Sequence, residues 1–352
     1  MKKKILIVST CPFNDDGLTK VILDIYENLK NDIYFEFATA FGFENKVGEI
    51  LSNQNVVMHE LNKKKQIIKY MSSIRRLVKK NNYDAVYIHG NSAMMFFEAF
   101  PCIFCDTEII THCHNTSSDY KIFHYLIKPF FNLVVDKKIA CSTSAANWAY
   151  KGENIYIVPN GIDSRKMRFS QKDRVEIRKK LGLSNEIIVG HIGRFNKQKN
   201  HKKVVNIFSE FNKIHKNSKL LLIGKGELLN EIKKLIKEKK IESDTIIVER
   251  TDYVEKYLSC MDVIILPSLF EGLGIVALEA QANGLPSIVS EKFPNEAKKT
   301  SSVRTLSLSE NDKTWVELMD ELYQMKHGEI SNDELYTMDL EKMMTEIKQI
   351  IR

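Results

Sequence analysis

Short apolar runs alternate with longer amphipathic segments along most of this chain, and this alternation is the feature that most restricts its fold. Ile5–Ser9 is an almost continuous apolar run, typical of a strand buried on both faces of a parallel sheet. After a polar loop, Thr19–Leu29 carries apolar residues at helical spacing. Repeated strand–helix units of this kind predict a doubly wound α/β fold.

The pattern restarts once, after the turn-forming segment Pro159–Asp163. The strands expected before it are Ile5–Ser9, Tyr34–Thr39, Val56–Glu60, Ala85–His89, Glu108–His112, Lys138–Ser142 and Ile155–Val158. Those expected after it are Ile187–His191, Lys219–Ile223, Thr245–Val248, Val263–Leu266 and Ser287–Ser290. We therefore expect a Rossmann-like domain over 1–165, a second one over 166–330, and a final helix in 331–352 that packs back on the first domain. Two facing halves leave a cleft at the carboxyl ends of their strands, where open α/β sheets bind ligands.

Composition excludes several classes of protein. The 352 residues carry a formal charge of +7, which is too mild to indicate nucleic acid binding. The apolar run near the N-terminus is too short for a signal peptide, and no run reaches the length of a membrane span. Among six cysteines the only close pair is Cys102 and Cys105, without a second pair to complete a zinc site. We expect buried, reduced thiols and a cytoplasmic protein.

The most informative segment is PSLFEGLGIVALEA, residues 267–280, which follows the expected strand Val263–Leu266. Its glycines suit a tight turn, and Ile275–Asn283 is a plausible helix. Glu271 then precedes this helix and Glu279 lies about one turn inside it. A helix N-terminus attracts phosphate, and a nearby carboxylate can accept hydrogen bonds from sugar hydroxyls. The alternative is a capped helix with two solvated glutamates.

Two further segments follow strands of the second half. Gly193–His201 (GRFNKQKNH) places Arg194 and Lys199 five residues apart, where the two cations can clamp a diphosphate. Gly224-Lys225-Gly226 follows the next strand, although a single G-x-G usually only connects a strand to a helix. A solvated basic loop is the alternative for the first segment. The carboxyl ends of three parallel strands would bring all three segments together.

These segments, together with VPNGID at residues 158–163, resemble family 4 of the retaining glycosyltransferases, which have the GT-B fold. The likeness is greatest to the capsular and exopolysaccharide branch and is densest from residue 155 to 290. It implies transfer of a hexose or N-acetylhexosamine from a UDP-sugar to a lipid-linked saccharide, with the anomeric configuration retained.

The resemblance also implies roles for individual residues. Arg194 and Lys199 match the pair that neutralises the donor diphosphate. Glu279 matches the carboxylate that holds the ribose hydroxyls, and Glu271 the one that contacts the transferred sugar. The backbone lying against sugar and phosphate matches Gly274, Ile275 and Val276. The remaining donor-binding positions are Gly17, Gly193, Gly224, Gly226 and Arg250.

In the first half, Thr111–Thr116 (THCHNT) resembles the family's H-x-H-N element. We expect His114 near the sugar, with His112 as the second candidate or as a hydrogen-bonded core residue. Two positions depart from the family pattern. Asp16 precedes Gly17 where the family usually has paired glycines, and Glu249 replaces a common glycine beside the expected base pocket.

The resemblance further implies front-face departure of the leaving diphosphate, whose oxygen takes the acceptor's proton. The protein then supplies charge stabilisation through Arg194, Lys199 and the helix end near Ile275. No Asp-x-Asp element follows a strand in the first half. We therefore expect no metal and no cofactor, and closure of the two halves would exclude water.

The basic segment Leu61–Lys80 has helical periodicity, eight basic residues and no acidic one. Nearby, Tyr120–Val135 is rich in aromatic and aliphatic residues. A solvated basic helix is the plain interpretation, and peripheral binding to an anionic membrane surface is the functional one. Two other functions stay open: a sugar-nucleotide epimerase of related fold, and a non-catalytic glycosyltransferase-like partner subunit. Such a subunit typically lacks the basic pair or the glutamates, whereas this sequence has Arg194, Lys199, Glu271 and Glu279.

Overall fold

The computed structural model describes residues 2–14, 17–62, 66–118, 120–325 and 327–352. The chain divides into two compact units, Met1–Gly161 with Leu340–Arg352 (unit 1) and Ile162–Asp339 (unit 2). The boundary thus falls at Gly161 rather than at residue 165. Of the expected 331–352 segment, the structure assigns the part up to Asp339 to unit 2 and only the last helix to unit 1.

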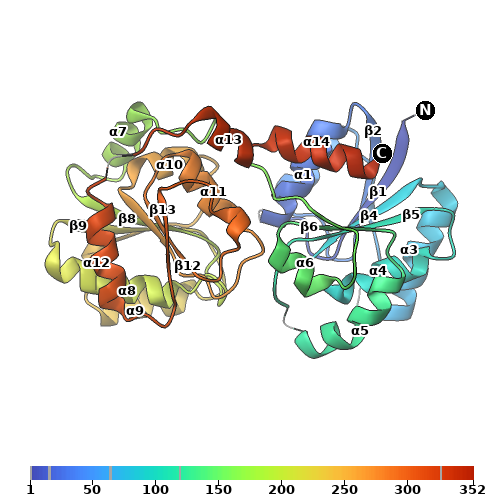
Figure 1. The fold of residues 1–352 in the computed structure, drawn as a ribbon, viewed down its shortest axis with the longest axis horizontal. Helices are drawn as coiled ribbons and strands as arrows, with labels where there is room; N and C mark the ends of the chain where they lie inside the picture. Colours follow the sequence, from blue (N-terminus) through green and yellow to red (C-terminus); the bar gives the residue numbers. More distant parts are fainter. Residues whose placement is uncertain (1, 15–16, 63–65, 119, 326) are drawn as a thin grey trace. The chain divides into compact units, whose positions relative to one another are not determined.

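Unit 1 contains a seven-stranded sheet of order β3-β2-β1-β4-β5-β6-β7, and each of its pairings is parallel (Figure 1). The strands are β1 (Lys3–Ser9), β2 (Ile33–Thr39), β3 (Met58–Glu60), β4 (Ala85–Gly90), β5 (Glu108–Cys113), β6 (Lys137–Ala140) and β7 (Ile155–Ile157). The helices are α1 (Gly17–Leu29), α2 (Asn45–Asn53), α3 (Ile67–Asn81), α4 (Phe96–Ala99), α5 (Lys121–Leu133), α6 (Thr143–Ala149) and α14 (Leu340–Ile351).

Unit 2 repeats the plan with a six-stranded parallel sheet of order β10-β9-β8-β11-β12-β13. The strands are β8 (Ile187–Ile192), β9 (Ser218–Ile223), β10 (Thr245–Val248), β11 (Val263–Leu266), β12 (Ser287–Ser290) and β13 (Val303–Leu306). The helices are α7 (Gln171–Lys180), α8 (His201–Ile214), α9 (Leu229–Glu238), α10 (Val254–Cys260), α11 (Ile275–Ala282), α12 (Asp312–Leu322) and α13 (Asn332–Met338).

The expected doubly wound architecture is confirmed in both units, since each strand expected from the sequence is present with its ends shifted by no more than two residues. Strand β13 at the sheet edge was not expected. The thiols of Cys102, Cys113, Cys141 and Cys260 are buried as expected, but Cys11 and Cys105 are partly exposed. No helix in the described part of the chain is long and apolar enough to cross a bilayer.

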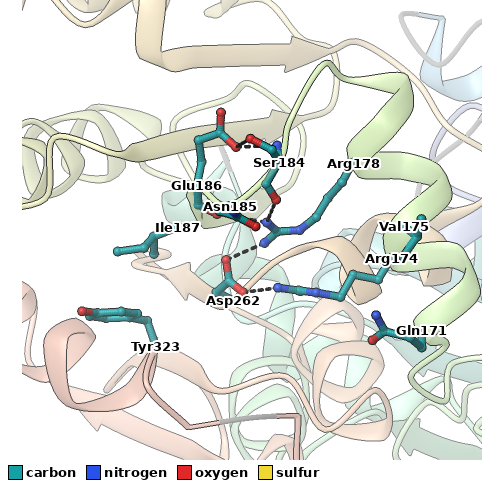
Figure 2. A pocket seen from close by; sticks show the side chains of 10 residues that line it. All are labelled: Gln171, Arg174, Val175, Arg178, Ser184, Asn185, Glu186, Ile187, Asp262 and Tyr323. Carbon is teal, nitrogen blue, oxygen red and sulfur yellow. Dashed lines mark hydrogen bonds and ion pairs between the residues drawn. The ribbon is translucent and has the colours of Figure 1, made fainter.

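Ion pairs hold the amino ends of the strands in unit 2. Asp262, just before β11, accepts hydrogen bonds from Arg174 at 2.5 Å and Arg178 at 2.7 Å, and from the backbone of Ile188 at 2.7 Å. These side chains line a pocket of about 440 Å³ that also includes Ser184 and Tyr323 (Figure 2). Because this pocket lies where strands begin, it is at the opposite end of the sheet from the expected donor-binding segments.

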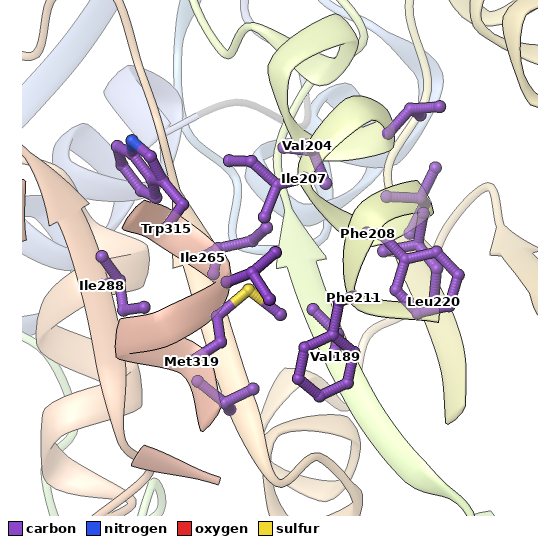
Figure 3. Packing of buried hydrophobic residues seen from close by; sticks show 14 of the residues in the cluster. Val189, Val204, Ile207, Phe208, Phe211, Leu220, Ile265, Ile288, Trp315 and Met319 are labelled. Carbon is purple, nitrogen blue, oxygen red and sulfur yellow. The ribbon is translucent and has the colours of Figure 1, made fainter. Parts of the chain in front are cut away.

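One hydrophobic core of unit 2 lies between its sheet and helices α8, α9 and α12. Figure 3 shows the part of it formed by α8, α12 and the strands. Trp315 and Met319 of α12 pack with Ile265 of β11 and Ile288 of β12, all fully buried. Burial of this kind is the main favourable contribution to folding. It holds the strand ends rigid and so positions the loops that follow them.

Helix α14 belongs to unit 1 although it is the last element of the chain. It buries Met343, Met344, Ile347, Ile350 and Ile351, and it packs against α1. Lys3 and Lys137 donate to the carbonyl oxygens of Ile351 and Ile350 at 2.9 and 2.7 Å. The end of the chain is thereby tied to the starts of β1 and β6.

We predict that Ile347→Ala lowers the stability of unit 1 by about 2–5 kcal/mol, because it leaves a cavity beneath α14. Ile347 is fully buried, whereas Gln349 on the same helix is exposed, so Gln349→Ala is the matched control. Scanning calorimetry of both variants measures the effect. Equal melting temperatures for the two variants would contradict the assignment of α14 to the core.

Candidate functional site

The three segments singled out in the second half of the sequence meet at one edge of the sheet in unit 2. Strands β9, β8 and β11 are neighbours and parallel, so the loops after them begin side by side. The backbone of Leu269 donates to the carbonyl of Gln198 at 2.8 Å, and Phe195 donates to the carbonyl of Lys225 at 2.9 Å. The clustering expected from the sequence is therefore present.

A partly buried ion pair joins the first two segments. Lys199 Nζ lies 2.6 Å from Glu271 Oε1, and their side chains are only 20% and 5% exposed. Gln198 Nε2 donates to the other carboxylate oxygen at 3.3 Å and to the carbonyl of Phe270 at 3.0 Å. Glu271 is thus held in place by two neighbours in sequence from the loop after β8. The role of Gln198 was not expected, and only its position beside Lys199 pointed to it.

The two glycines of the G-x-G segment are required because the backbone of another loop packs closely against them. Gly224 has φ +147°, and a Cβ there would lie 2.1 Å from the carbonyl oxygen of Gly193. Gly226 has φ +159°, and a Cβ there would lie 2.4 Å from the carbonyl oxygen of Phe195. Any side chain at either position would force the two loops apart. The two glycines therefore bring the loop after β9 against the loop that contains Arg194.

Arg194 and Arg250 are the exposed cations of the expected donor set. The Arg194 side chain is 56% exposed, and its Nε lies 3.5 Å from Glu227, which is equally open to solvent. An exposed pair of this kind is weak, so the guanidinium can exchange this partner for a ligand. Arg250 is exposed, and its neighbour Glu249 lies 3.8 Å from Lys233. Glu249 therefore has a local cation to pair with.

Helix α11 begins where the sequence places it. Gly274 precedes the helix in a left-handed conformation (φ +90°), and a Cβ there would lie 2.4 Å from the Phe293 ring. Ile275 and Val276 supply the first turn and are partly exposed. Glu279, inside the helix, and Glu271, before it, are each only 4% exposed. The interpretation as two solvated glutamates is therefore wrong, because burial of a carboxylate requires partners.

Unit 1 places three histidines together at the carboxyl ends of β4 and β5. His89 pairs in register with His112, and His114 follows β5. His89 Nδ1 lies 3.0 Å from His114 Nε2, and the Tyr87 hydroxyl lies 2.9 Å from His112 Nδ1. His112 is thus a fully buried, hydrogen-bonded core residue, as one of the two interpretations held. His89 was missed, although its place at the end of the neighbouring parallel strand was available from the sequence.

Burial keeps these three imidazoles neutral. It lowers the pKa of His114 to about 3, and the polar side chain of Asn160 only partly opposes this effect. Burial lowers the pKa of His89 and His112 well below the usual value as well. Each ring offers a nitrogen within 4.8 Å of the others, which is close enough for a transition metal ion. One nitrogen of each ring is already hydrogen-bonded, and we interpret the cluster as a neutral, hydrogen-bonded group that orients His114.

Near the start of the chain, Gly17 is the first residue of α1. Asp16, the departure from the paired-glycine pattern, lies outside the described residues. The same holds for 63–65 within the basic segment, whose helix α3 begins at Ile67.

We predict that the protein loses stability as pH falls from about 7 to 5. Burial lowers the pKa of His124 and His191 to about 4 and of His201 to about 2, so the folded chain resists protonation there. Unfolded histidines titrate near pH 6.5. Below that pH the unfolded state binds more protons, so this contribution to stability is complete above 6.5 and decreases towards the folded values.

Melting temperatures across this pH range measure the effect. His201 stacks on Phe195 with ring centres 3.9 Å apart, so His201→Phe keeps a stacked ring without a titrating nitrogen. That variant should show a shallower dependence than the wild type. A melting temperature that stays constant or rises as pH falls would contradict the prediction.

Comparisons with known proteins agree with this geometry. The family model described as Glycosyltransferase Family 4 matches residues 17–166, and the one described as Glycosyl transferases group 1 matches residues 173–333. The putative glycosyltransferase EpsF of Bacillus subtilis is 27% identical over 266 residues, which cover 70% of this chain and 68% of that protein. The UDP-Gal:alpha-D-GlcNAc-diphosphoundecaprenol alpha-1,3-galactosyltransferase of Escherichia coli is 26% identical over 241 residues, 63% of this chain and 62% of its own length.

Among solved structures, Anabaena Alr3699/HepE in complex with UDP-glucose superposes with a TM-score of 0.83. The identity is 16%, and the match covers 99% of both chains. A glycosyltransferase from Rickettsia africae superposes with a TM-score of 0.79 at 18% identity, covering 99% of this chain and 97% of that one. The two family models together span most of the sequence, one for each half. The chain is therefore a glycosyltransferase of the GT-B fold, with a Family 4 first half and a second half of the group 1 family.

Proposed function

We propose that this enzyme transfers a hexose or N-acetylhexosamine from a UDP-sugar to a lipid-linked saccharide in the synthesis of a capsular or exopolysaccharide, with retention of configuration. The observation that carries the proposal is the set of charged groups at one sheet edge of unit 2. Arg194 is exposed there, and Lys199 is paired to the buried Glu271. A solved relative of the same fold binds UDP-glucose, which supports a UDP-sugar donor.

In this proposal Arg194 and Lys199 neutralise the diphosphate, and the N-terminus of α11 adds the positive end of its helix dipole. Glu279 binds the ribose hydroxyls and Glu271 the transferred sugar. The pairing of Glu271 with Lys199 supports this division, because it holds the proposed sugar-binding carboxylate next to a proposed phosphate-binding cation. Gly17, Gly193, Gly224, Gly226, Arg250, Gly274, Ile275 and Val276 complete the proposed donor contacts.

The proposed chemistry is departure of the UDP from the face that the acceptor approaches. The acceptor hydroxyl gives its proton to the leaving phosphate oxygen while its oxygen bonds to the anomeric carbon. The cations stabilise the charge that develops on the diphosphate, and prearranged charges of this kind are usually the largest catalytic effect. His114, neutral because of burial, is proposed to hydrogen-bond the sugar rather than to act as an acid.

The names of several relatives support the acceptor class. One Escherichia coli relative acts on a diphosphoundecaprenol-linked sugar, and others are named for O-antigen or amylovoran biosynthesis. A lipid-linked acceptor places the enzyme at the inner face of the cell membrane. We therefore propose a cytoplasmic protein that binds an anionic membrane surface, with the basic residues of Leu61–Lys80 contributing electrostatic attraction.

We predict that Arg194→Ala reduces transfer about 100-fold, because the loss of one charge contact to the developing diphosphate costs about 3 kcal/mol. The fold should be unaffected, since Arg194 is exposed and weakly paired. Lys197, exposed in the same loop, provides the matched control Lys197→Ala. Turnover of UDP-sugars measures the effect, and near-normal turnover by the Arg194 variant would refute the clamp.

Lys199 needs a different substitution. Lys199→Ala should also cut transfer strongly, but it leaves the buried Glu271 carboxylate without its cation, which typically costs about 3–5 kcal/mol. Lys199→Gln keeps a hydrogen-bond donor to Glu271 and removes the charge, so it separates catalysis from stability. A Gln variant with wild-type melting temperature and wild-type turnover would show that this cation has no part in transfer.

We predict that transfer proceeds without added metal, because Arg194 and Lys199 supply the positive charge that a bound metal ion supplies in metal-dependent enzymes. Activity should be equal in EDTA and in the presence of manganese or magnesium. Loss of activity in EDTA that either metal restores would contradict the metal-independent mechanism. The histidine cluster makes zinc a useful third addition.

A further inference from the structure

Helix α5 buries two polar side chains, His124 and Lys128, and exposes most of its large apolar side chains, which is unlike an ordinary surface helix. The buried side chains are His124, Lys128 and Phe131, which share one face at helical spacing. The opposite face consists of large apolar side chains, each between 57% and 83% exposed: Ile122, Phe123, Tyr125, Leu126, Phe130 and Leu133. This face is unusual for a helix in contact with water only.

Specific contacts fix this orientation. The His124 ring stacks on Trp148 with centres 3.6 Å apart, and its Nδ1 accepts a hydrogen bond from the backbone of Ala93 at 3.1 Å. Lys128 Nζ donates to the carbonyl of Asn147 at 2.6 Å. Rotating the helix to bury its apolar face would break these bonds and leave polar groups unpaired. The apolar face is therefore held outward.

Basic side chains lie on α3, which packs against the same short helix α4 as α5 does. Helices α3 and α5 both contact α4, and each also contacts one of the 3₁₀ turns beside it, Ala93–Met95 or Phe100–Cys102 (Figure 1). The sequences of α3 and α5 contain no acidic residue. The exposed cations of α3 are Lys69, Arg75, Arg76, Lys79 and Lys80. Arg75 also lies 5.0 Å above the ring of the exposed Phe104.

A bilayer with anionic lipids matches both features at once. Its acyl chains take up apolar side chains, and its headgroups attract cations such as those of α3. We propose that α5 is an interfacial membrane helix, which lies in the plane of an anionic bilayer with its outward face among the acyl chains. With 13 residues it is too short to span. The proposal rests on and refines the membrane part of the proposed function. Helix α3 supplies electrostatic attraction to anionic headgroups, and α5 supplies hydrophobic binding that high salt does not remove.

The test is cosedimentation with vesicles of equal parts phosphatidylglycerol and phosphatidylcholine, at low and at high salt. The α5 variant is Ile122→Ser, Leu126→Ser and Leu133→Ser together. The matched control replaces three exposed apolar residues of unit 2, Val175→Ser, Ile214→Ser and Tyr336→Ser. A charge variant carries Lys69→Gln, Arg76→Gln and Lys79→Gln. Size-exclusion chromatography of each protein reports its oligomeric state.

The wild type and the unit 2 control should bind at low salt and keep part of this binding at high salt. The α5 variant should need at least about tenfold more lipid for half-maximal binding at high salt, and the charge variant should be weaker mainly at low salt. Equal binding by the α5 variant and wild type would overturn the proposal. So would a wild-type dimer that the α5 variant converts to monomer without any vesicle binding, because a second copy would then cover this face.

The vesicle assay uses neither donor nor acceptor, so its result is independent of the proposed transfer reaction. Activity on a soluble acceptor analogue should be unchanged in the α5 variant, because α5 contributes no proposed donor contact. If vesicle binding fails while transfer is intact, only the membrane proposal is lost. If transfer fails while vesicle binding is intact, the proposed function is wrong and α5 still binds lipid.

Discussion

Parallel strand pairing is the constraint on which both units depend. Each pairing in the described part of the chain is parallel, so each strand must be followed by a return connection, and the carboxyl ends share one edge. This geometry brings together segments that lie far apart in sequence, such as Lys199 with Glu271 in unit 2. The same rule places His89 beside His112 and His114 in unit 1.

Two local features then turn a general sheet edge into a specific site. The absence of side chains at Gly224 and Gly226 lets the loop after β9 lie against the backbone of residues 193–195. The Lys199–Glu271 ion pair fastens the loop after β8 to the segment before α11. An ion pair shielded from water adds little net stability, but removing one partner is costly. Its contribution here is to fix the position of a carboxylate and a cation together.

Much of this was predictable because parallel strands buried on both faces leave a strong signal. Runs such as Ile5–Ser9 and Val263–Leu266 are apolar throughout their centre, and the structure places strands there. Strand β13 escaped prediction because Val303–Leu306 is short, lies at a sheet edge and is only partly buried. Its four residues therefore carry neither a continuous apolar run nor a clear alternation of apolar and polar residues.

The sequence predicts which segments form the site, but not all of the contacts between their side chains. The burial of Glu271 and Glu279, the hydrogen bond from Gln198 and the participation of His89 all depend on tertiary packing, which spacing in sequence does not encode. The outward apolar face of α5 is a similar case. Periodicity alone indicates an amphipathic helix, but which face is buried depends on the stacking of His124 on Trp148.

That stacking has a consequence for spectroscopy. The sequence contains two tryptophans, Trp148 in unit 1 and Trp315 in unit 2. The indole of Trp315 is fully buried in the hydrophobic core of unit 2. That of Trp148 stacks on an imidazole with planes 1° apart and donates its N–H to the carbonyl of Asn91 at 2.9 Å. Each unit therefore contains its own fluorophore in a distinct environment. Replacing one tryptophan leaves a chain whose emission reports on the other unit alone, without any attached dye.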